Sequence, residues 1–367
     1  MKKILFLITG LGLGGAEKVV CDLADEMFNK GHEVKIAFLT GSIVVSPKNK
    51  NIELIYLELN SLSDGYSVYK KFKKIILDFQ PDIVHSHMVH ANIFARLSRR
   101  FIKIPRLICS AHSTNEGGKL RMLAYRFTHN LSEVTTNVSN EASSNFIVNK
   151  AVMNGEILTV YNGIDLKKFI ANNVDLSVLK KRLNISAEAK VLIAVGRFHE
   201  AKDYPNLINA FNIFLANFDK NLFHLFIVGD GDPAIITEIK NLIQTYNLGN
   251  NIHLLGRRDD IAELLSGADL FVLSSKYEGL PTVVIEAMAC ETFVVATDCG
   301  GSAEILGETG ILVPIQNSEA LAKGLEQAIN LNEDQIRNNG KLARERVEKL
   351  FSLEASVNKW LALYEAE

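Results

Sequence analysis

Arg197 and Lys202, in the second half of the chain, have the types and spacing needed to hold a diphosphate. They lie in "VGRFHEAKDYPNL", where an apolar strand pattern gives way to a helical one that starts near Pro205. Two cations in a strand-to-helix loop neutralise a diphosphate and stabilise it as a leaving group. The alternative interpretation is a surface loop with exposed charges.

A second chemical pair is formed by Glu278 and Glu286 in "SSKYEGLPTVVIEAMA". Glu278 follows an expected strand, and Pro281 can open a helix at its first turn. The amides of Thr282 and Val283 are then free to bind an anion. Glu286 can accept hydrogen bonds from a ribose, and Glu278 can reach sugar hydroxyls or balance positive charge at a reacting carbon. The alternative is one capping and one surface carboxylate, but an unpartnered carboxylate at the apolar position of Glu286 is costly.

The glycine-rich stretch "ITGLGLGGAEKVV" follows the apolar run "KKILFLI" and contains G-x-G-x-x-G at Gly10, Gly12 and Gly15. A strand before the glycines and a helix after them predict an anion-binding loop. A dinucleotide site also needs an acid at the end of the second strand, and residues 39–42 offer neither an acid nor an arginine. A signal peptide is disfavoured because the glycines interrupt its apolar core.

The ordered motifs "GLGGAEKVV", "VYNGID", "GRFHEAKDYPNL", "EGLPTVVIEAMA" and "GGSAEIL" resemble those of the retaining glycosyltransferases of family 4, which have the GT-B fold. The resemblance covers nearly the whole chain. It implies two doubly wound Rossmann-like domains that face each other across a cleft. It also implies transfer of a sugar from a nucleotide diphosphate to an acceptor hydroxyl.

The resemblance also assigns site residues, with Arg197 and Lys202 on the donor diphosphate, Glu286 on the ribose and Glu278 on the donor sugar. Its catalytic residues are Glu278, Arg197, Lys202 and His112. Its donor-binding residues are Gly14, Gly15, Arg197, Lys202, Gly256, Arg257, Thr282, Val283 and Glu286. Its acceptor-side residues are His87, Asn92 and Glu116. Many relatives have Phe-Gly where Leu280 and Pro281 stand, so one phosphate contact is lost or shifted here.

Two further patterns could hold a metal ion. Asp230 and Asp232 form a D-x-D pair in "GDGDP", and His85, His87 and His90 have a spacing that suits zinc. The first follows a strand as a tight turn, and the second has no carboxylate or cysteine close by. We therefore expect a turn and a polar lining of the cleft, and a reaction that needs no metal or cofactor.

These residues must be positioned by short apolar strands that alternate with helical patterns along both halves of the chain. Such alternation predicts an α/β fold with parallel sheets covered on both faces. The expected strands are 3–9, 34–40, 52–57, 82–86, 106–111, 134–138 and 157–161, then 190–196, 223–229, 251–255, 269–274, 293–297 and 310–313. We expect an acceptor-side domain over 1–168, a donor-binding domain over 169–350, and a helix within 351–367 that docks back on the first domain.

Composition indicates a globular protein, since 47% of its 367 residues are hydrophobic and 22% are charged. The four cysteines lack a C-x-x-C spacing, so we expect reduced thiols in the cytoplasm. Residues 1–165 carry a net charge of +5 and the remainder −7. The basic stretches 70–74 and 96–103 predict contact with an anionic membrane, on its inner face, unless they are only solvated helix faces. Nucleic acid is not expected, because no aromatic residues are interleaved with these charges.

By analogy with such relatives, we expect a uridine diphosphate sugar as donor and a lipid-linked saccharide of surface polysaccharide as acceptor. No carboxylate is assigned as a nucleophile, which suits departure and attack on the same face of the sugar. The alternatives are a non-catalytic nucleotide-sugar-binding protein, and another GT-B enzyme, such as one that acts on a soluble acceptor.

Overall fold

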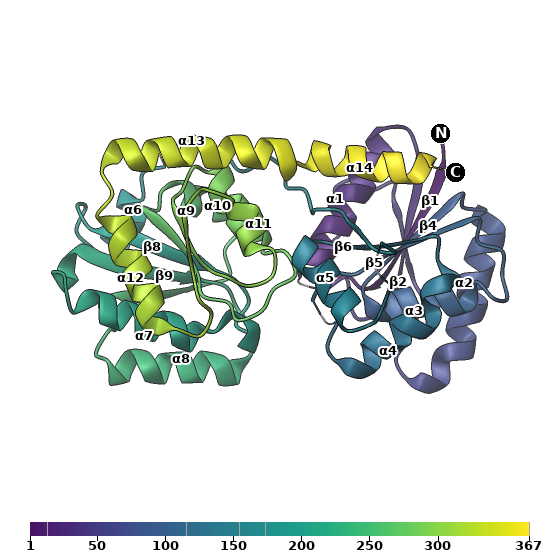
Figure 1. Ribbon diagram of the computed structural model, residues 1–367, viewed down its shortest axis with the longest axis horizontal. Coiled ribbons are helices and arrows are strands. Elements are labelled where there is room, and N and C mark those ends of the chain that lie inside the picture. The colour runs from purple at the N-terminus through teal and green to yellow at the C-terminus, as the bar shows by residue number, and fades with distance from the viewer. Residues whose placement is uncertain (13, 115, 154, 173, 367) are drawn as a thin grey trace. The chain divides into compact units, whose positions relative to one another are not determined.

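The computed structural model describes residues 1–12, 14–114, 116–153, 155–172 and 174–366. The chain forms two compact units, Met1–Gly163 with Leu353–Glu367 and Ile164–Ser352 (Figure 1). The chain passes from unit 1 to unit 2 after residue 163, whereas the sequence predicted a boundary after 168. It returns to unit 1 after residue 352, whereas the sequence predicted a boundary after 350. The two boundaries lie side by side, because Ile164 forms a β-bridge with Ser352. The Ile164 amide donates a hydrogen bond to the Phe351 carbonyl at 2.9 Å.

Unit 1 is built on a seven-stranded parallel sheet with the order β3-β2-β1-β4-β5-β6-β7. The strands are β1 (Lys3–Gly10), β2 (Glu33–Thr40), β3 (Glu53–Tyr56), β4 (Ile83–His87), β5 (Arg106–Ser110), β6 (Val134–Asn137) and β7 (Leu158–Thr159). Each corresponds to a strand predicted from the sequence. The order reverses between β1 and β4, so the glycine loop and the chain after His87 leave neighbouring strands at the same edge.

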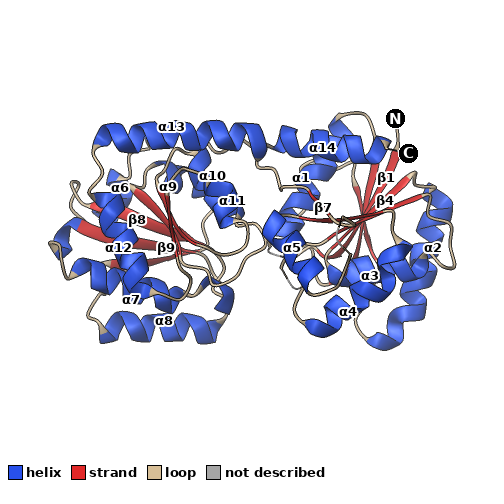
Figure 2. Ribbon diagram, in the orientation of Figure 1, coloured by secondary structure: helices blue, strands red, loops and turns tan. Residues whose placement is uncertain are grey.

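Helices cover both faces of this sheet (Figure 2). They are α1 (Gly15–Asn29), α2 (Gly65–Phe79), α3 (Val89–Ser98), α4 (Lys119–Thr128), α5 (Asn140–Val148) and α14 (Leu353–Glu365), with short 3₁₀ turns at Leu62–Asp64 and His129–Leu131. Alternate residues of β1 separate the two faces. Phe6 packs in the core that includes α1 and α14, whereas Leu5 and Leu7 pack in the core that includes α2 and α3.

Unit 2 has a six-stranded parallel sheet with the order β10-β9-β8-β11-β12-β13. Its strands are β8 (Lys190–Val195), β9 (Phe223–Val228), β10 (Ile252–Gly256), β11 (Leu270–Leu273), β12 (Val294–Thr297) and β13 (Ile311–Val313). All were predicted from continuous apolar runs, which are typical of strands buried on both faces. The doubly wound α/β fold expected from the sequence is therefore confirmed in both units.

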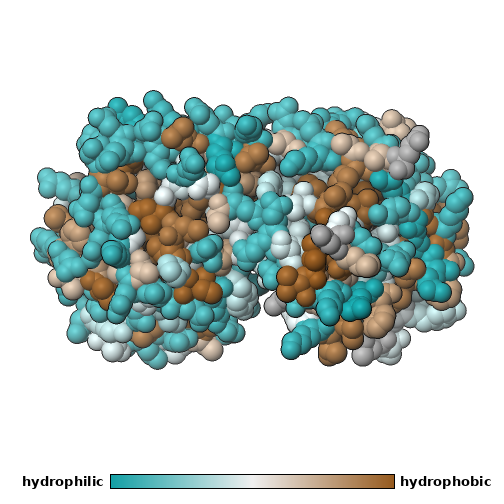
Figure 3. All heavy atoms as spheres, viewed as in Figure 1, coloured by the Kyte–Doolittle hydropathy of each residue, from teal (hydrophilic) through white to brown (hydrophobic). Residues whose placement is uncertain are grey.

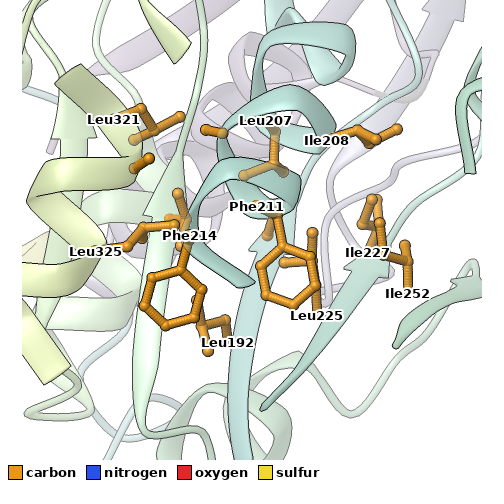
Figure 4. Close-up of a cluster of buried hydrophobic side chains, with 14 of the residues drawn as sticks. Leu192, Leu207, Ile208, Phe211, Phe214, Leu225, Ile227, Ile252, Leu321 and Leu325 are labelled. Carbon is orange, nitrogen blue, oxygen red and sulfur yellow. The ribbon is translucent and has the colours of Figure 1, made fainter. Parts of the chain in front are cut away.

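The helices of unit 2 are α6 (Ser177–Arg182), α7 (Tyr204–Leu215), α8 (Pro233–Thr245), α9 (Ile261–Ser266), α10 (Thr282–Ala289), α11 (Ser302–Leu306), α12 (Ser318–Ile329) and α13 (Glu333–Leu350), with 3₁₀ turns at Glu200–Lys202 and Lys220–Leu222. On one face of the sheet, Phe211 and Phe214 of α7 pack over Leu192 and Leu225 of the strands (Figure 4). Each such side chain contributes about 1.5–3 kcal/mol when it is buried. This core fixes the strand ends that carry the candidate site.

Candidate active site

The candidate donor site of unit 2 lies where the order of its strands reverses. β8 pairs with β9 on one side and with β11 on the other, so the loops after β8 and β11 leave the sheet next to each other. Ligands of open parallel sheets bind beyond the strand ends at such a point. The first loop carries Arg197 and Lys202, and the second carries Glu278. The fold thus brings together residues that are about 80 positions apart in the sequence.

Hydrogen bonds join these two loops. Ser274 Oγ donates to the Lys202 carbonyl at 2.8 Å, and the Lys276 amide donates to the Ala201 carbonyl, also at 2.8 Å. On the solvent-exposed side of these loops, Lys276 Nζ lies 2.5 Å from Glu200 Oε1. This bond holds the pKa of the Glu200 carboxyl below its usual value. The backbone around the site is therefore fixed before any ligand binds.

Lys202 and Glu278 form an ion pair, with 2.6 Å between Nζ and Oε1. Ser275 Oγ donates to the same Glu278 oxygen at 2.7 Å. Only 20% of the Lys202 side chain and 16% of the Glu278 side chain are exposed, so water screens the pair weakly. Lys202 is thus compensated by a carboxylate in this state, and a bound diphosphate would share or take over its ammonium group.

Gly300 allows the Glu278 backbone to lie close by. Its φ is +55°, and a Cβ there would lie 2.5 Å from the Glu278 carbonyl oxygen. Any other residue would be strained and would push the β11 loop away. This explains one glycine of "GGSAEIL" in physical terms.

Helix α10 begins directly after Pro281, as the sequence predicts. Thr282 and Val283 are its first two residues, whose amides have no acceptor within the helix. Glu286 lies one turn further along and is only 8% exposed, among fully buried apolar neighbours. This carboxylate already has an interaction within the described residues, and its role as a ligand for ribose hydroxyl groups stays a prediction.

The other predicted donor residues lie at the same edge of the sheet. Arg197 is exposed and, among the described residues, has no ion pair. Gly256, with φ of +65°, and Arg257 are exposed at the end of β10, which β9 separates from β8. The neighbouring Arg258 is instead held by Asp260, at 2.8 and 2.5 Å.

The D-x-D pair forms a turn. Asp232 Oδ1 accepts from the Ala234 amide at 2.8 Å and caps α8, and Asp230 Oδ1 accepts from the Gly231 amide at 2.8 Å. Phe198 pairs with Gly231 through an isolated bridge. Across the described ranges, no group of three or more His, Cys, Asp or Glu side chains could hold a metal ion.

The glycine loop of unit 1 ends at Gly14, the N-cap of α1, and Gly15 is the first residue of that helix. A Cβ at Gly14 would make the Glu17 carboxylate shift, whereas a Cβ at Gly15 would meet nothing within 4 Å. The open space beside Gly15 is consistent with the predicted approach of a phosphate. Residue 13, within the motif, lies outside the described residues.

Three histidines lie together, His85 and His87 on β4 and His112 just after the end of β5. His87 Nδ1 lies 3.0 Å from His112 Nε2, and the rings of His85 and His87 have centroids 4.0 Å apart. His85 is 0% exposed, and both of its nitrogens are bonded, to the hydroxyls of Tyr364 and Ser110, each at 2.7 Å. Burial lowers the pKa of His112 to about 4 and that of the other two well below the usual value, so the cluster is neutral. His90 lies on the exposed side of α3, apart from the cluster.

Asn92 and Glu116 lie inside unit 1. Asn92 Nδ2 donates to the Ser110 carbonyl at 2.9 Å and to Tyr125 Oη at 2.7 Å, and its side chain is fully buried. Glu116 Oε1 accepts from the His112 amide at 2.9 Å, and burial raises the pKa of this carboxyl. The structure therefore gives both residues a part in holding the His112 loop, besides the acceptor-side role assigned from the sequence.

The basic stretch 96–103, which the sequence analysis offers for membrane contact, is only partly exposed. Arg96 is 0% exposed and donates to Thr135 Oγ1 at 2.6 Å, with its guanidinium over the Tyr125 ring. Arg99 pairs with Glu133. In the other basic stretch, Lys71 pairs with Glu58, whereas Lys70, Lys73 and Lys74 are exposed.

Sequence reasoning missed two partners of the site. Ser275 stands in the quoted "SSKYEG" but was not assigned, although a serine three residues before a key glutamate is a signal for a local hydrogen bond. Tyr204 donates to the Gly196 carbonyl at 2.8 Å and so fixes the β8 loop. Nothing in the local pattern pointed to this bond.

Comparison with known proteins identifies the family. Residues 13–168 match the model described as glycosyltransferase family 4, and residues 177–345 match glycosyl transferases group 1. An N-acetyl-α-D-glucosaminyl L-malate synthase of Bacillus anthracis is 30% identical over 96% of this chain and 94% of its own. The chain belongs to the family 4 glycosyltransferases. It is an enzyme of the GT-B fold.

Two other similar proteins are an enzyme related in sequence and a solved structure with the same fold. A UDP-Gal:α-D-GlcNAc-diphosphoundecaprenol α-1,3-galactosyltransferase of Escherichia coli is 27% identical over 86% of this chain and 81% of its own. Among solved structures, Anabaena HepE, in complex with UDP and glucose, has a TM-score of 0.86 and 20% identity, with 100% of both chains covered. This likeness shows the fold of the glycosyltransferase.

Proposed function

We propose that this glycosyltransferase moves a sugar from a uridine diphosphate donor to a hydroxyl of a lipid-linked saccharide, with retention of configuration, in surface polysaccharide synthesis. The Lys202–Glu278 pair, on the two loops at the strand reversal of unit 2, carries the proposal. The two side chains lie 2.6 Å apart, so a cation that would hold the diphosphate stands next to a carboxylate that would hold the sugar. The name of the Escherichia coli relative supports both the donor and the acceptor class.

The chemistry would need no protein nucleophile. The bond between the sugar anomeric carbon and the β-phosphate oxygen breaks, and the acceptor oxygen bonds to the same face of that carbon. The acceptor proton passes to the departing phosphate, and the products are the glycosylated acceptor and UDP. Arg197, Lys202 and the first turn of α10 would stabilise the leaving diphosphate. Glu278 is engaged by two donors, which suits a positioning or charge-balancing carboxylate more than an attacking one.

The test is transfer from UDP-hexoses and UDP-N-acetylhexosamines to a diphospholipid-linked N-acetylhexosamine, followed by the anomeric configuration of the product. We expect turnover with one donor and an α-linked product from an α-linked donor. Binding of UDP-sugars without transfer or hydrolysis would favour the non-catalytic alternative. Transfer to free L-malate and to no lipid-linked saccharide would favour a soluble acceptor, which the name of the Bacillus anthracis relative keeps open.

We also propose that unit 1 meets an anionic membrane, and the exposed side of α4 is the surface that supports this best. Leu120, Leu123 and Phe127 recur at helical spacing and are 83%, 47% and 77% exposed. Lys119 and Arg126 are exposed on the same helix. Apolar and basic residues on one exposed helix suit shallow insertion among anionic headgroups. Figure 3 shows hydrophobic and hydrophilic residues side by side over the part of unit 1 where Figure 1 labels α4.

This surface lies next in the chain to the His112–Glu116 loop. Docking by α4 would thus bring that loop to the headgroup level, where a lipid-linked acceptor presents its diphosphate. Among the described residues, no helix is long and apolar enough to cross a bilayer.

Co-sedimentation with vesicles tests the membrane proposal. We expect binding that needs anionic lipid, weakens in high salt, and falls in a Leu120→Ser, Phe127→Ser variant. Val178→Ser is the matched control, because Val178 is 80% exposed on unit 2. Changing Lys70, Lys73 and Lys74 to Gln tests the contribution of α2. Equal binding by the α4 variant and the control would rule out the α4 surface.

A further inference from the structure

His87 cannot contact an acceptor directly in this structure, although the sequence places it on the acceptor side. Its side chain is 1% exposed. Nδ1 faces His112 Nε2 at 3.0 Å, and Nε2 is buried without a hydrogen-bond partner. A different role is needed for a buried polar ring at the strand reversal of unit 1.

Counting protons decides which way the His87–His112 bond runs. Both rings are neutral, so each carries one N–H and the short contact holds one proton. If His112 Nε2–H donated, His87 would carry its own proton on Nε2, as a buried donor without a partner. If His87 Nδ1–H donates instead, His87 Nε2 carries no proton and is only a buried acceptor without a partner. Orphaned buried N–H groups are rarer than under-satisfied acceptors, so the second arrangement is favoured.

We propose that His87 is a positioning residue that holds His112 in the tautomer with its proton on Nδ1. His112 then presents Nδ1–H to a ligand, and within the described residues this nitrogen makes no hydrogen bond, while its side chain is partly exposed. The proposal rests on the proposed function in one respect: the ligand is a sugar hydroxyl of the donor, whose oxygen accepts this proton.

The surroundings keep the His87 ring in place. Phe6 packs at 5.9 Å between centroids and His85 at 4.0 Å. The next residue, Met88, has φ of +72° and ψ of 156°, a region that is essentially restricted to glycine. Its amide donates to the Ser110 carbonyl at 3.0 Å. A strained backbone that is retained directly beside His87 is typical of functional sites.

Nitrogen NMR of histidine-labelled protein, without ligand, tests the tautomer directly. The chain has nine histidines, so His112→Asn is used only to assign the His112 signal. We expect protonated Nδ1 in the wild type and loss of this preference in His87→Phe, which keeps the ring but removes the donor. His87→Asn keeps a hydrogen-bond donor near the position of His87 Nδ1, so His112 should again prefer the tautomer with its proton on Nδ1. Tyr364→Phe is the control, because it removes a partner of His85 and leaves the His87–His112 contact intact.

Transfer assays on the same variants test the role in catalysis. We expect kcat/KM for the donor to fall about fivefold in His87→Phe and to recover in His87→Asn, as for a neutral hydrogen bond. A wild-type His112 protonated on Nε2, or a tautomer unchanged by His87→Phe, would overturn the proposal. The proposal would also be overturned if His87→Phe lost the Nδ1-protonated tautomer of His112 but kept the wild-type kcat/KM for the donor. Absence of any transfer by the wild type would contradict the proposed function, while the NMR result would still decide the state of the pair.

Discussion

At the level of single residues, the Lys202–Glu278 pair allows a sharp test of the donor site. We predict that Lys202→Met lowers kcat/KM for the donor by roughly 10- to 150-fold, because a charged hydrogen bond to the leaving group contributes about 1.5–3 kcal/mol. Steady-state kinetics measure this loss, and thermal unfolding shows whether the fold is intact. Lys276→Met is the matched control, since it breaks the ion pair with Glu200 on the same two loops. Equal losses in the two variants would mean that Lys202 only holds the loops together.

Gly15 offers a second test, because its replacement costs the fold little. We predict that Gly15→Ala leaves the unfolding free energy unchanged or raises it by about 0.4–1 kcal/mol, since no atom lies within 4 Å of the new Cβ. The added methyl group should raise KM for the donor if phosphates approach the start of α1. Gly65→Ala is the control, because Gly65 begins α2 with equally open space. An unchanged KM would remove Gly15 from the donor-binding set.

The residue types of the site could be predicted from the sequence, but their pairing could not. The quoted motifs name Lys202 and Glu278 as separate ligands of diphosphate and sugar. Their contact depends on β8 and β11 being neighbours, which is a property of strand order and not of local pattern. The same holds for His87, whose spacing to His85 suggested polar lining or zinc, while its partner His112 comes from the next strand loop.

At the level of elements, the strands were predictable and the inward-facing polar residues were not. Parallel strands buried on both faces are continuous apolar runs, so both sheets are visible in the sequence. Arg96 looked like a surface cation because arginine is rarely buried. Its acceptors Thr128, Ser132 and Thr135 are supplied by a later segment, so only the fold shows that its guanidinium donors find partners inside.

The first turn of α8 gives a prediction about metal dependence. We predict that Asp232→Ala lowers the unfolding free energy by about 1 kcal/mol through the lost N-cap, and that transfer survives EDTA in both wild type and variant. In the proposed site, Arg197, Lys202 and the first turn of α10 would already supply positive charge to the leaving group. Asn317→Ala, which removes the cap of α12, should destabilise similarly without touching the D-x-D pair. Activity abolished by EDTA and restored by manganese would instead make Asp230 and Asp232 metal ligands.

At the level of the whole molecule, the last helix joins the two ends of the chain. Val357, Trp360 and Tyr364 of α14 are buried in the same core as Ile4, Phe6 and Ile8 of β1. Lys2 Nζ donates to the Tyr364 carbonyl at 2.8 Å. The helical stripe in 353–366 shows that this segment must bury a face. Its contact with His85, through Tyr364, links the chain terminus to the histidine cluster of unit 1.

Burial of the histidine cluster makes the stability of unit 1 sensitive to acid. His85, His87 and His112 have pKa values lowered in the folded state, to about 4 for His112, whereas an unfolded histidine titrates near 6.5. The unfolded chain therefore binds more protons below pH 6.5, so stability is complete above this value and is lost as the pH falls toward 4. Glu116, with a raised pKa, acts in the opposite direction but is a single group.

We predict that the unfolding midpoint of unit 1 falls clearly between about pH 7.5 and 5.5, because each such histidine costs roughly 1.4 kcal/mol over this range. The single tryptophan, Trp360, is a local probe, since its ring lies 4.4 Å from that of His85. Its fluorescence should report an earlier melt at the lower pH, and circular dichroism should follow the whole chain. The deeply buried cluster belongs to unit 1, so the tryptophan midpoint should move more than the remaining helical signal. A Trp360 midpoint that is the same at both pH values would show that these histidines do not stay neutral through burial.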